Sequence, residues 1–246
     1  MTALTTILCL LALTLGAPGP ASGTRVSTAP NPEPRAQSTL PLPPNYTTTF
    51  ESPDVIVMHV HYGAHEFVPM HDHSAYPTVY VYLNDAGEVD IKHEGPNGFI
   101  AHRPPTHTGA FRISPGMTER HSVQSNSDTD SDFLRIELKR IPPTDLKQVF
   151  RGEVPTPLPP GLHTEFEDAA LRIERIVCPS DKPYSAPPPA ATRSLLVAIT
   201  PAQIKTPDGS RAIKAGDVIW LPAGGKSSPA FTPGAQYLRI SLLYSE

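Results

Sequence analysis

Three short apolar segments of this chain occur twice, in the same order. The pairs are TVYVYLND at 78–85 with SLLVAITP at 194–201, GAFRISPG at 109–116 with GDVIWLPA at 216–223, and FLRIELK at 133–139 with YLRISLL at 237–243. The segments are rich in β-branched and aromatic residues and are bounded by turn residues, a pattern typical of strands in a sandwich or barrel. The repeat therefore predicts two copies of one β-unit, at 50–141 and 163–246, joined by a linker at 142–162.

The amino-acid composition favours the same fold class. Proline accounts for 31 of the 246 residues, and proline breaks helices and is confined to turns and edges in sheets. The net charge is −4 with both signs interspersed, which gives no reason to expect nucleic acid or an anionic membrane as a partner. The prediction is an all-β protein.

The N-terminus has the pattern of an export signal. Residues 3–15 form an apolar run of the length of a signal-peptide core, too short to span a bilayer, and small residues and prolines follow. We expect a signal peptide at 1–21, a disordered Pro-rich spacer at 22–49, and a secreted or periplasmic protein with no membrane contact after signal removal. Cys9 would leave with the signal, so Cys178 would have no intrachain disulfide partner.

Two histidines stand two positions apart at the head of the first repeat segment. His71 and His73 lie on one face of a strand if the segment is extended, because strand side chains alternate between faces. His121 stands near the start of a later strand. Three imidazoles converging from two strands would hold a divalent transition metal, with Fe, Zn, Cu, Ni and Mn as the candidates.

These residues resemble the two motifs of the cupin superfamily, Gly-x5-His-x-His-x3–4-Glu-x6-Gly and Gly-x5-Pro-x-Gly-x2-His-x3-Asn. His71-Asp72-His73 matches the first motif, but its Glu position falls on Pro77 or Thr78. Gly109-x5-Pro115 followed by His121 matches the second, with His121 one residue late. Together with the repeat, the resemblance implies a bicupin, that is, two double-stranded β-helix (jelly-roll) barrels in tandem.

The second copy lacks the histidines. Aligning the repeat segments places Pro187 and Pro189 at the positions of His71 and His73, and Ser228 at that of His121. Neither proline nor serine is a ligand for a transition metal. We therefore expect the metal site in the first barrel alone, and a structural or docking role for the second.

Several residues near the predicted ligands have two interpretations. Water is expected first as the fourth ligand, because a catalytic site keeps an open position. Glu119 is the other candidate, as a ligand or a general base, although a solvated turn carboxylate is the plainer interpretation of this residue. Tyr76 and Tyr80 could also reach the site, but Tyr80 and Tyr82 are expected to pack on the outer face of the barrel or at a contact between barrels. Val79 and Val81 are then expected in the pocket wall.

The remaining barrel residues are assigned from alternation. In the segment around 111–113, either Arg112 or its two apolar neighbours line the barrel, and the alternation alone does not choose. His59 and His61 alternate with inward apolar residues, so they are expected to face outward, with a second metal patch as the less favoured alternative. His93 and His107 are both expected to be exposed near turns. Of the two, His107 is expected to lie closer to the site.

Two functions from different classes fit this site. Cupin metal centres carry out oxygen-dependent cleavage, sugar isomerisation or hydrolysis, and a three-histidine iron site resembles that of thiol dioxygenases. The first hypothesis is accordingly a metal-dependent dioxygenase acting on a small organic substrate, and the second is a module that binds a metal or small ligand without turnover. Either would be a monomer or a homodimer with a small-molecule partner.

Overall fold

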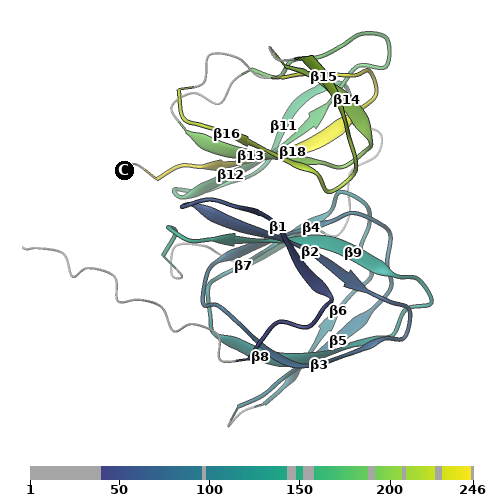
Figure 1. Ribbon diagram of the computed structural model, residues 1–246, viewed down its shortest axis with the longest axis vertical. Coiled ribbons are helices and arrows are strands. Elements are labelled where there is room, and N and C mark those ends of the chain that lie inside the picture. Colours follow the sequence, from purple (N-terminus) through teal and green to yellow (C-terminus); the bar gives the residue numbers. More distant parts are fainter. Residues whose placement is uncertain are drawn as a thin grey trace, which may run out of the picture. The chain divides into compact units, whose positions relative to one another are not determined.

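The computed structural model of the chain describes residues 40–95, 98–142, 148–151, 158–187, 192–206, 209–224 and 229–244. Every regular element among these residues is a strand (Figure 1). Within this described part, no helix is long and apolar enough to cross a membrane. The prediction of an all-β chain is confirmed.

Two antiparallel sheets build the first barrel. The larger has six strands in the order β1-β2-β9-β4-β7-β10, and the smaller has four in the order β3-β8-β5-β6. The strands are β1 (Tyr46–Glu51), β2 (Val55–Tyr62), β3 (Phe67–His73), β4 (Thr78–Tyr82), β5 (Val89–His93), β6 (Ile100–Arg103), β7 (Phe111–Ser114), β8 (Glu119–Ser125), β9 (Ser131–Leu138) and β10 (Val149–Arg151).

The second barrel repeats this plan. Its five-stranded sheet has the order β11-β12-β18-β13-β16, and its three-stranded sheet has the order β15-β14-β17. The strands are β11 (Gly161–Glu167), β12 (Leu171–Val177), β13 (Arg193–Ala198), β14 (Ala202–Thr206), β15 (Gly209–Ile213), β16 (Val218–Leu221), β17 (Ala230–Phe231) and β18 (Gln236–Leu242). The order β1-β2-β9-β4-β7 is matched by β11-β12-β18-β13-β16, so the sequence repeat corresponds to a structural repeat.

Some strands lie outside the predicted barrel bounds. β1 begins at Tyr46, so the last residues of the segment expected to be a spacer pair with β2. β10 lies inside the expected linker and pairs with β7. Residues 1–39, which include the predicted signal peptide and most of the spacer, lie outside the described residues.

The largest apolar cluster joins the two barrels. It combines buried side chains from β2, β4, β7 and β9 of the first barrel with buried side chains from β12, β13 and β18 of the second, including Val79, Val81, Leu195 and Ile240. All five residues of β4 are therefore buried, because one face of the strand points into its own barrel and the other is covered by the second barrel. Burial on both faces removes the usual alternation of apolar and polar residues.

The glycine of each repeated Gly-x5-Pro segment lies against the other barrel. Gly109 has a φ of 82°, and a Cβ there would lie 2.8 Å from Arg175 Nη1 and 3.2 Å from Ile199 Cγ2. Gly216 has a φ of 85°, and a Cβ there would lie 2.8 Å from Leu83 Cδ1. Glycine is required at these turns both for the left-handed backbone and for the close approach.

Gly109→Ala should destabilise the protein more than the backbone conformation alone explains. A left-handed alanine costs about 1–2 kcal/mol, and the added methyl also meets Arg175, which is held by Glu165 and by the Gly109 carbonyl oxygen. Gly234→Ala is the matched control, because Gly234 has a φ of 75° but nothing within 4 Å of the added Cβ. Urea unfolding should show that Gly109→Ala lowers the free energy of unfolding by about twice as much as the control substitution does. Equal losses would show that the approach of the two barrels tolerates a methyl group.

Candidate metal centre

Three histidines meet in the four-stranded sheet of the first barrel, where the edge strand β3 pairs with β8. His71 is the cross-strand partner of His121, while His73 shares its strand face with His71. The ring centroids are 4.7 Å apart for His71 and His121, 4.8 Å for His71 and His73, and 5.1 Å for His73 and His121. One nitrogen from each of the three buried rings lies within 4.8 Å of the others, so the cluster is able to hold a metal ion.

The hydrogen bonds around the cluster leave ring nitrogens available. His71 Nδ1 lies 2.8 Å from the Pro69 carbonyl oxygen, so it carries the proton and leaves Nε2 as an acceptor, which the Tyr46 hydroxyl contacts at 3.0 Å. Both ring nitrogens of His73 and Nδ1 of His121 are buried without a hydrogen-bond partner in the described chain. Buried polar atoms are rarely left unpaired, and an ion is one of the few explanations for a group of them. A backbone carbonyl that fixes the tautomer of a histidine is also the usual support of a metal ligand.

Burial keeps the three rings neutral. Desolvation lowers the pKa of His71, lowers that of His73 well below its usual value, and lowers the pKa of His121 to about 2. The positive charge of Arg135 acts in the same direction on all three rings. Neutral imidazole is the form that coordinates a metal, so the electrostatics of the site fit the donor set.

We expect the metal-free protein to lose stability as the pH falls below 6.5, the usual histidine pKa. The unfolded chain takes up protons there while the folded cluster does not, so the unfolded state is favoured by about 1.4 kcal/mol per pH unit for each histidine that stays neutral. Urea unfolding of chelator-treated protein between about pH 7.5 and pH 5 measures this slope. His121→Gln should reduce this dependence of the unfolding free energy on pH by roughly the contribution of one histidine. An unchanged pH dependence would contradict the inference that the folded protein keeps His121 neutral.

Glu119 is buried, which differs from the solvated turn carboxylate that the sequence favoured. It is the first residue of β8, lies on the same face as His121 and is 9% exposed. Its Oε2 lies 3.3 Å from Arg135 Nη1 and 4.0 Å from His121 Nδ1. In the sequence, the two-residue spacing between Glu119 and His121 indicates that their side chains share one face of a strand.

Arg135 is a central residue that sequence reasoning missed. It lies on β9, and its Nε donates to Glu137 Oε1 at 3.0 Å, while its Nη1 donates to the Tyr80 hydroxyl at 2.6 Å. Burial lowers the pKa of Arg135, but Tyr80, Glu119 and Glu137 outweigh this and raise it overall. The arginine therefore holds Glu119 in place beside His121 as a permanent cation.

Tyr46 is a second missed residue, because it lay in the segment expected to be a spacer. Its hydroxyl lies 3.0 Å from His71 Nε2 and 2.7 Å from the Tyr62 hydroxyl. Its ring centroid is 5.0 Å from those of His71 and His73. β1 thus places an aromatic ring directly against the histidine cluster.

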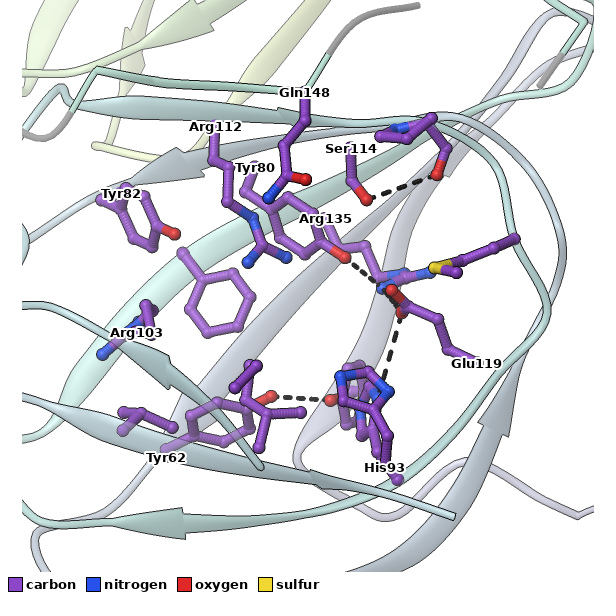
Figure 2. Close-up of a pocket in the computed structure, with 18 of the residues that line it drawn as sticks. Tyr62, Tyr80, Tyr82, His93, Arg103, Arg112, Ser114, Glu119, Arg135 and Gln148 are labelled. Atoms are coloured by element: carbon purple, nitrogen blue, oxygen red, sulfur yellow. Dashed lines mark hydrogen bonds and ion pairs between the residues drawn. The ribbon is translucent and has the colours of Figure 1, made fainter. Parts of the chain in front are cut away.

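A cavity of about 320 Å³ inside the first barrel adjoins the cluster, and Figure 2 shows its lining. His121 and Glu119 form part of its wall, together with Tyr62, Tyr80 and Tyr82. Phe99 and Met117 also line the cavity and are 56% and 54% exposed, so they stand at its mouth.

The cavity wall corrects one expectation about β4 and settles an open question about β7. Tyr80 and Tyr82 point into the cavity, whereas Val79 and Val81, which were expected in its wall, belong to the apolar cluster between the barrels. Arg112 is the inward residue of β7, and its apolar neighbours pack against the second barrel. The expectation had the two faces of β4 reversed, because it assigned the tyrosines and not the valines to the face that the second barrel covers.

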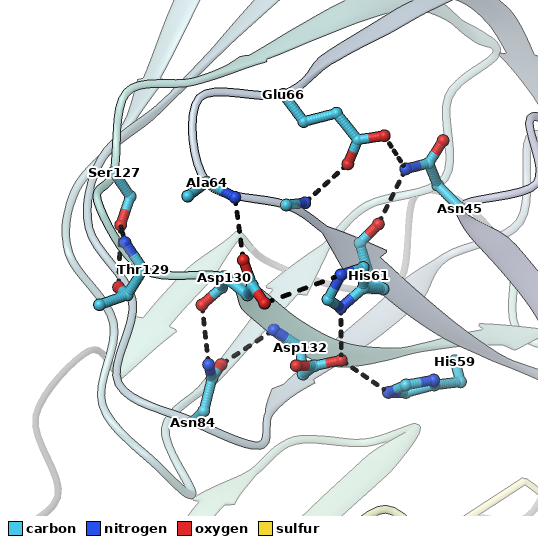
Figure 3. A network of polar contacts seen from close by, with 11 residues as sticks. Asn45, His59, His61, Ala64, Glu66, Asn84, Ser127, Thr129, Asp130 and Asp132 are labelled. Carbon is cyan, nitrogen blue, oxygen red and sulfur yellow. Dashed lines mark hydrogen bonds and ion pairs between the residues drawn. The ribbon is translucent and has the colours of Figure 1, made fainter.

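The other histidines of the first barrel lie apart from the cluster, with one exception. His59 Nε2 and His61 Nδ1 both contact Asp132 Oδ1, at 3.2 and 3.1 Å, in a surface network that also includes Asp130 and Asn84 (Figure 3). Their predicted outward orientation is confirmed. Within the described chain, only His71, His73 and His121 form a group able to hold a metal.

His93 is the exception, and it corrects the expectation for His107. His93 stacks on Phe99 and lines the cavity, with its ring centroid 5.3 Å from that of His121. His107 is exposed beside Asp85 and is not among the residues that line the cavity. His93 is brought to the site by the pairing of β5 with β8, where it faces His121 directly.

The second barrel has an apolar interior in place of a histidine cluster. Phe231, Tyr237, Ile204 and the buried Cys178 belong to its core, and burial raises the pKa of the Cys178 thiol to about 11. The carbonyl oxygen of Pro187 accepts a hydrogen bond from Arg239. Pro189 and Ser228, the other two predicted replacements, lie outside the described residues.

The described residues form two antiparallel barrels in tandem, with a buried histidine cluster in the first. Solved structures show that this arrangement is the bicupin fold. A scan against models of protein families finds no match, and a search of curated proteins finds no related sequence.

Solved structures with this fold include several bacterial proteins. The bacterial pirin YhhW from Escherichia coli, solved in complex with nickel(II), has a TM-score of 0.54 and 15% identity over 80% of this chain and 90% of its own. YlbA from E. coli has a TM-score of 0.54 and 11% identity over 82% and 86%. GK1651 from Geobacillus kaustophilus has a TM-score of 0.53 and 11% identity over 85% and 95%.

Proposed function

We propose that the first barrel is a mononuclear metal centre of an oxidoreductase of the dioxygenase type, with His71, His73 and His121 as the protein ligands. The main support for this proposal is the position of His121, which belongs both to the histidine cluster able to hold a metal and to the wall of the cavity. An ion held by the three rings would lie beside a space large enough for a small organic molecule. Such adjacency is what a catalytic metal site requires and a purely structural site does not.

The donor set indicates which metals are suitable. Three neutral imidazoles suit iron, copper, nickel and zinc, and the nickel(II) complex of the pirin YhhW supports a first-row transition metal in a protein of this fold. Three neutral ligands leave the full charge of a divalent ion uncompensated by the protein. A bound metal would supply Lewis acidity toward a coordinated substrate and, in the case of iron or copper, redox chemistry.

The protein's own residues have separate parts in this proposal. Glu119 is the carboxylate of the cavity wall nearest to His121 and is the candidate to accept or hold a proton there. Arg135 and Tyr80 position Glu119 from behind, and the aromatic walls exclude water from the space in front of the cluster.

Metal analysis and oxygen consumption test the proposal. Protein purified without a chelating tag should contain about one transition metal ion per chain by mass spectrometry. An iron-loaded sample should consume oxygen with a member of a panel of phenolics, thiols and diketones, and His73→Ala should not. Substoichiometric metal would overturn the metal centre, and tight metal retention with no oxygen uptake would favour the non-catalytic binding module.

We also propose that the chain is exported. The support is the apolar run at 3–15, followed by small residues and proline up to Ala21. N-terminal sequencing of the mature protein should find residue 22 at the start, and an intact Met1 in the mature protein would remove this proposal.

A further inference from the structure

The buried arginines of the described chain differ in how their charges are balanced. Arg135, Arg175 and Arg239 each form an ion pair with at least one glutamate. Arg103 is 6% exposed, donates to the Ser131 hydroxyl and the Gly87 carbonyl oxygen, and lies with its guanidinium carbon 5.4 Å from the centre of the Tyr82 ring. No carboxylate of the described residues lies within ion-pair distance of it, and its Nε has no hydrogen-bond partner there.

Arg112 is a second guanidinium of the cavity wall that no carboxylate of the described residues contacts, although the more distant charge of Glu119 acts on it. It lies 4.3 Å above the ring of Tyr80, and its buried Nε makes no hydrogen bond within the described chain. Like Arg103, it lines the cavity, and in Figure 2 its guanidinium points into the space among Tyr80, Tyr82 and Arg135. No carboxylate of the described residues forms an ion pair with Arg112.

The cavity therefore carries an excess of positive charge. Its lining includes Arg103, Arg112 and Arg135, and Glu119 is the single acidic side chain among the described residues that line it. Burying a charge without a partner is costly, and buried cations are normally paired within the protein. Two guanidinium groups that face one cavity without an ion-pair partner among the described residues are explained if an anion completes the site.

The volume of the cavity and its aromatic side chains indicate which class of anion would fit. Tyr62, Tyr80, Tyr82, Phe99 and Phe133 surround the cavity, and aromatic walls favour a flat, apolar body between them. A volume of about 320 Å³ lies at the lower end of the range for ligand pockets, which suits a molecule with one ring. Guanidinium groups bind carboxylates through two parallel hydrogen bonds.

We propose that the cavity binds a small aromatic carboxylate, with the carboxylate held by Arg112 and supported by Arg103, and the ring held between the tyrosines and Phe133. The binding site itself requires only the chain. The further statement that the ring lies beside a metal at His121, and that this acid is the substrate, rests on the proposed function.

Calorimetric titration with benzoate and benzamide tests the inference on wild-type protein. The two probes have the same ring and nearly the same shape, but only benzoate carries a negative charge. Benzoate should bind at least about 10-fold more tightly than benzamide, as expected for a charge-assisted hydrogen-bonded pair. Equal affinities, or no binding of benzoate at millimolar concentration, would overturn the proposal.

Substitutions of Arg112 test whether this residue binds the anion. Arg112→Met should weaken benzoate binding by about 10- to 100-fold and leave benzamide binding unchanged, and Arg112→Lys should have an intermediate effect because it keeps the charge but loses the paired geometry. Arg172→Met is the matched control, because Arg172 is a surface arginine of the second barrel paired with Glu167. An equal effect of the two methionine variants would place the anion elsewhere.

Performing each titration on chelator-treated and metal-loaded protein separates this inference from the proposed function. Benzoate binding that depends on Arg112 in a chain that retains no metal would support the anion site and refute the metal centre. Stoichiometric metal together with equal binding of the two probes would refute the anion site alone.

Discussion

His71→Ala, His73→Ala and His121→Ala should each abolish stoichiometric metal binding. A three-ligand site that loses one imidazole keeps only two protein ligands, and we expect its affinity to fall by more than the 10- to 100-fold that is typical when a residue supporting a ligand is removed. The rings of all three residues are buried together, with one nitrogen of each within 4.8 Å of the others. Metal content after dialysis, measured by mass spectrometry, is the readout.

The second His-x-His of the chain is the control. His59→Ala and His61→Ala remove histidines with the same two-residue spacing from β2, the preceding strand in the chain, where both rings face outward to Asp132. These variants should retain the metal content of the wild type. If they lose metal as readily as the cluster variants, the ion is held at the surface network of Figure 3 and the proposed centre is wrong.

Arg135→Met should produce the largest loss of stability among single substitutions in the first barrel. The substitution leaves the buried carboxylates of Glu119 and Glu137 without their cation, and breaking a buried ion pair from one side costs about 3–5 kcal/mol. For a chain of this size the melting temperature should fall by roughly 10 °C. Differential scanning calorimetry of the metal-free protein measures the change.

Two further variants show whether the unpaired carboxylates cause this loss. Adding Glu137→Gln to Arg135→Met should recover part of the stability, because the amide is neutral and can still contact the Ser74 hydroxyl that now lies 2.6 Å from Glu137. Arg172→Met breaks an exposed ion pair with Glu167 and should cost less than about 1 kcal/mol. No recovery in the double variant would mean that the packing of the Arg135 side chain, and not its charge, stabilises the barrel.

The parts of the fold that could be predicted are those governed by local spacing. Strand side chains alternate with a period of two, so His71 and His73 were predicted to share a face, and the outward orientation of His59 and His61 followed from the same rule. The ordered repeat predicted two barrels with a common plan, and the matched strand order confirms it. These inferences need no knowledge of distant contacts.

The composition of the cavity could not be predicted in the same way. Alternation shows that Val79 and Tyr80 face opposite ways but not which of them faces inward, and apolar valine was the natural choice for an interior. The second barrel reverses that choice, because it covers the outer face of β4 and makes that face the apolar one. Arg112 and Tyr82 are directed into the cavity for the same reason.

The amino-acid sequence by itself determined the strands, the duplication and the pair of histidines on one face, because each depends on the order of neighbouring residues along the chain. The resemblance to the cupin motifs already implied His121 as the third histidine, and the tertiary structure places it with the pair. Only the tertiary structure decided that Tyr46 and His93 lie against the cluster, and which sheet face is the wall of the cavity. These contacts join residues from separate strands, and their positions depend on how the sheets close and on the packing of one barrel against the other.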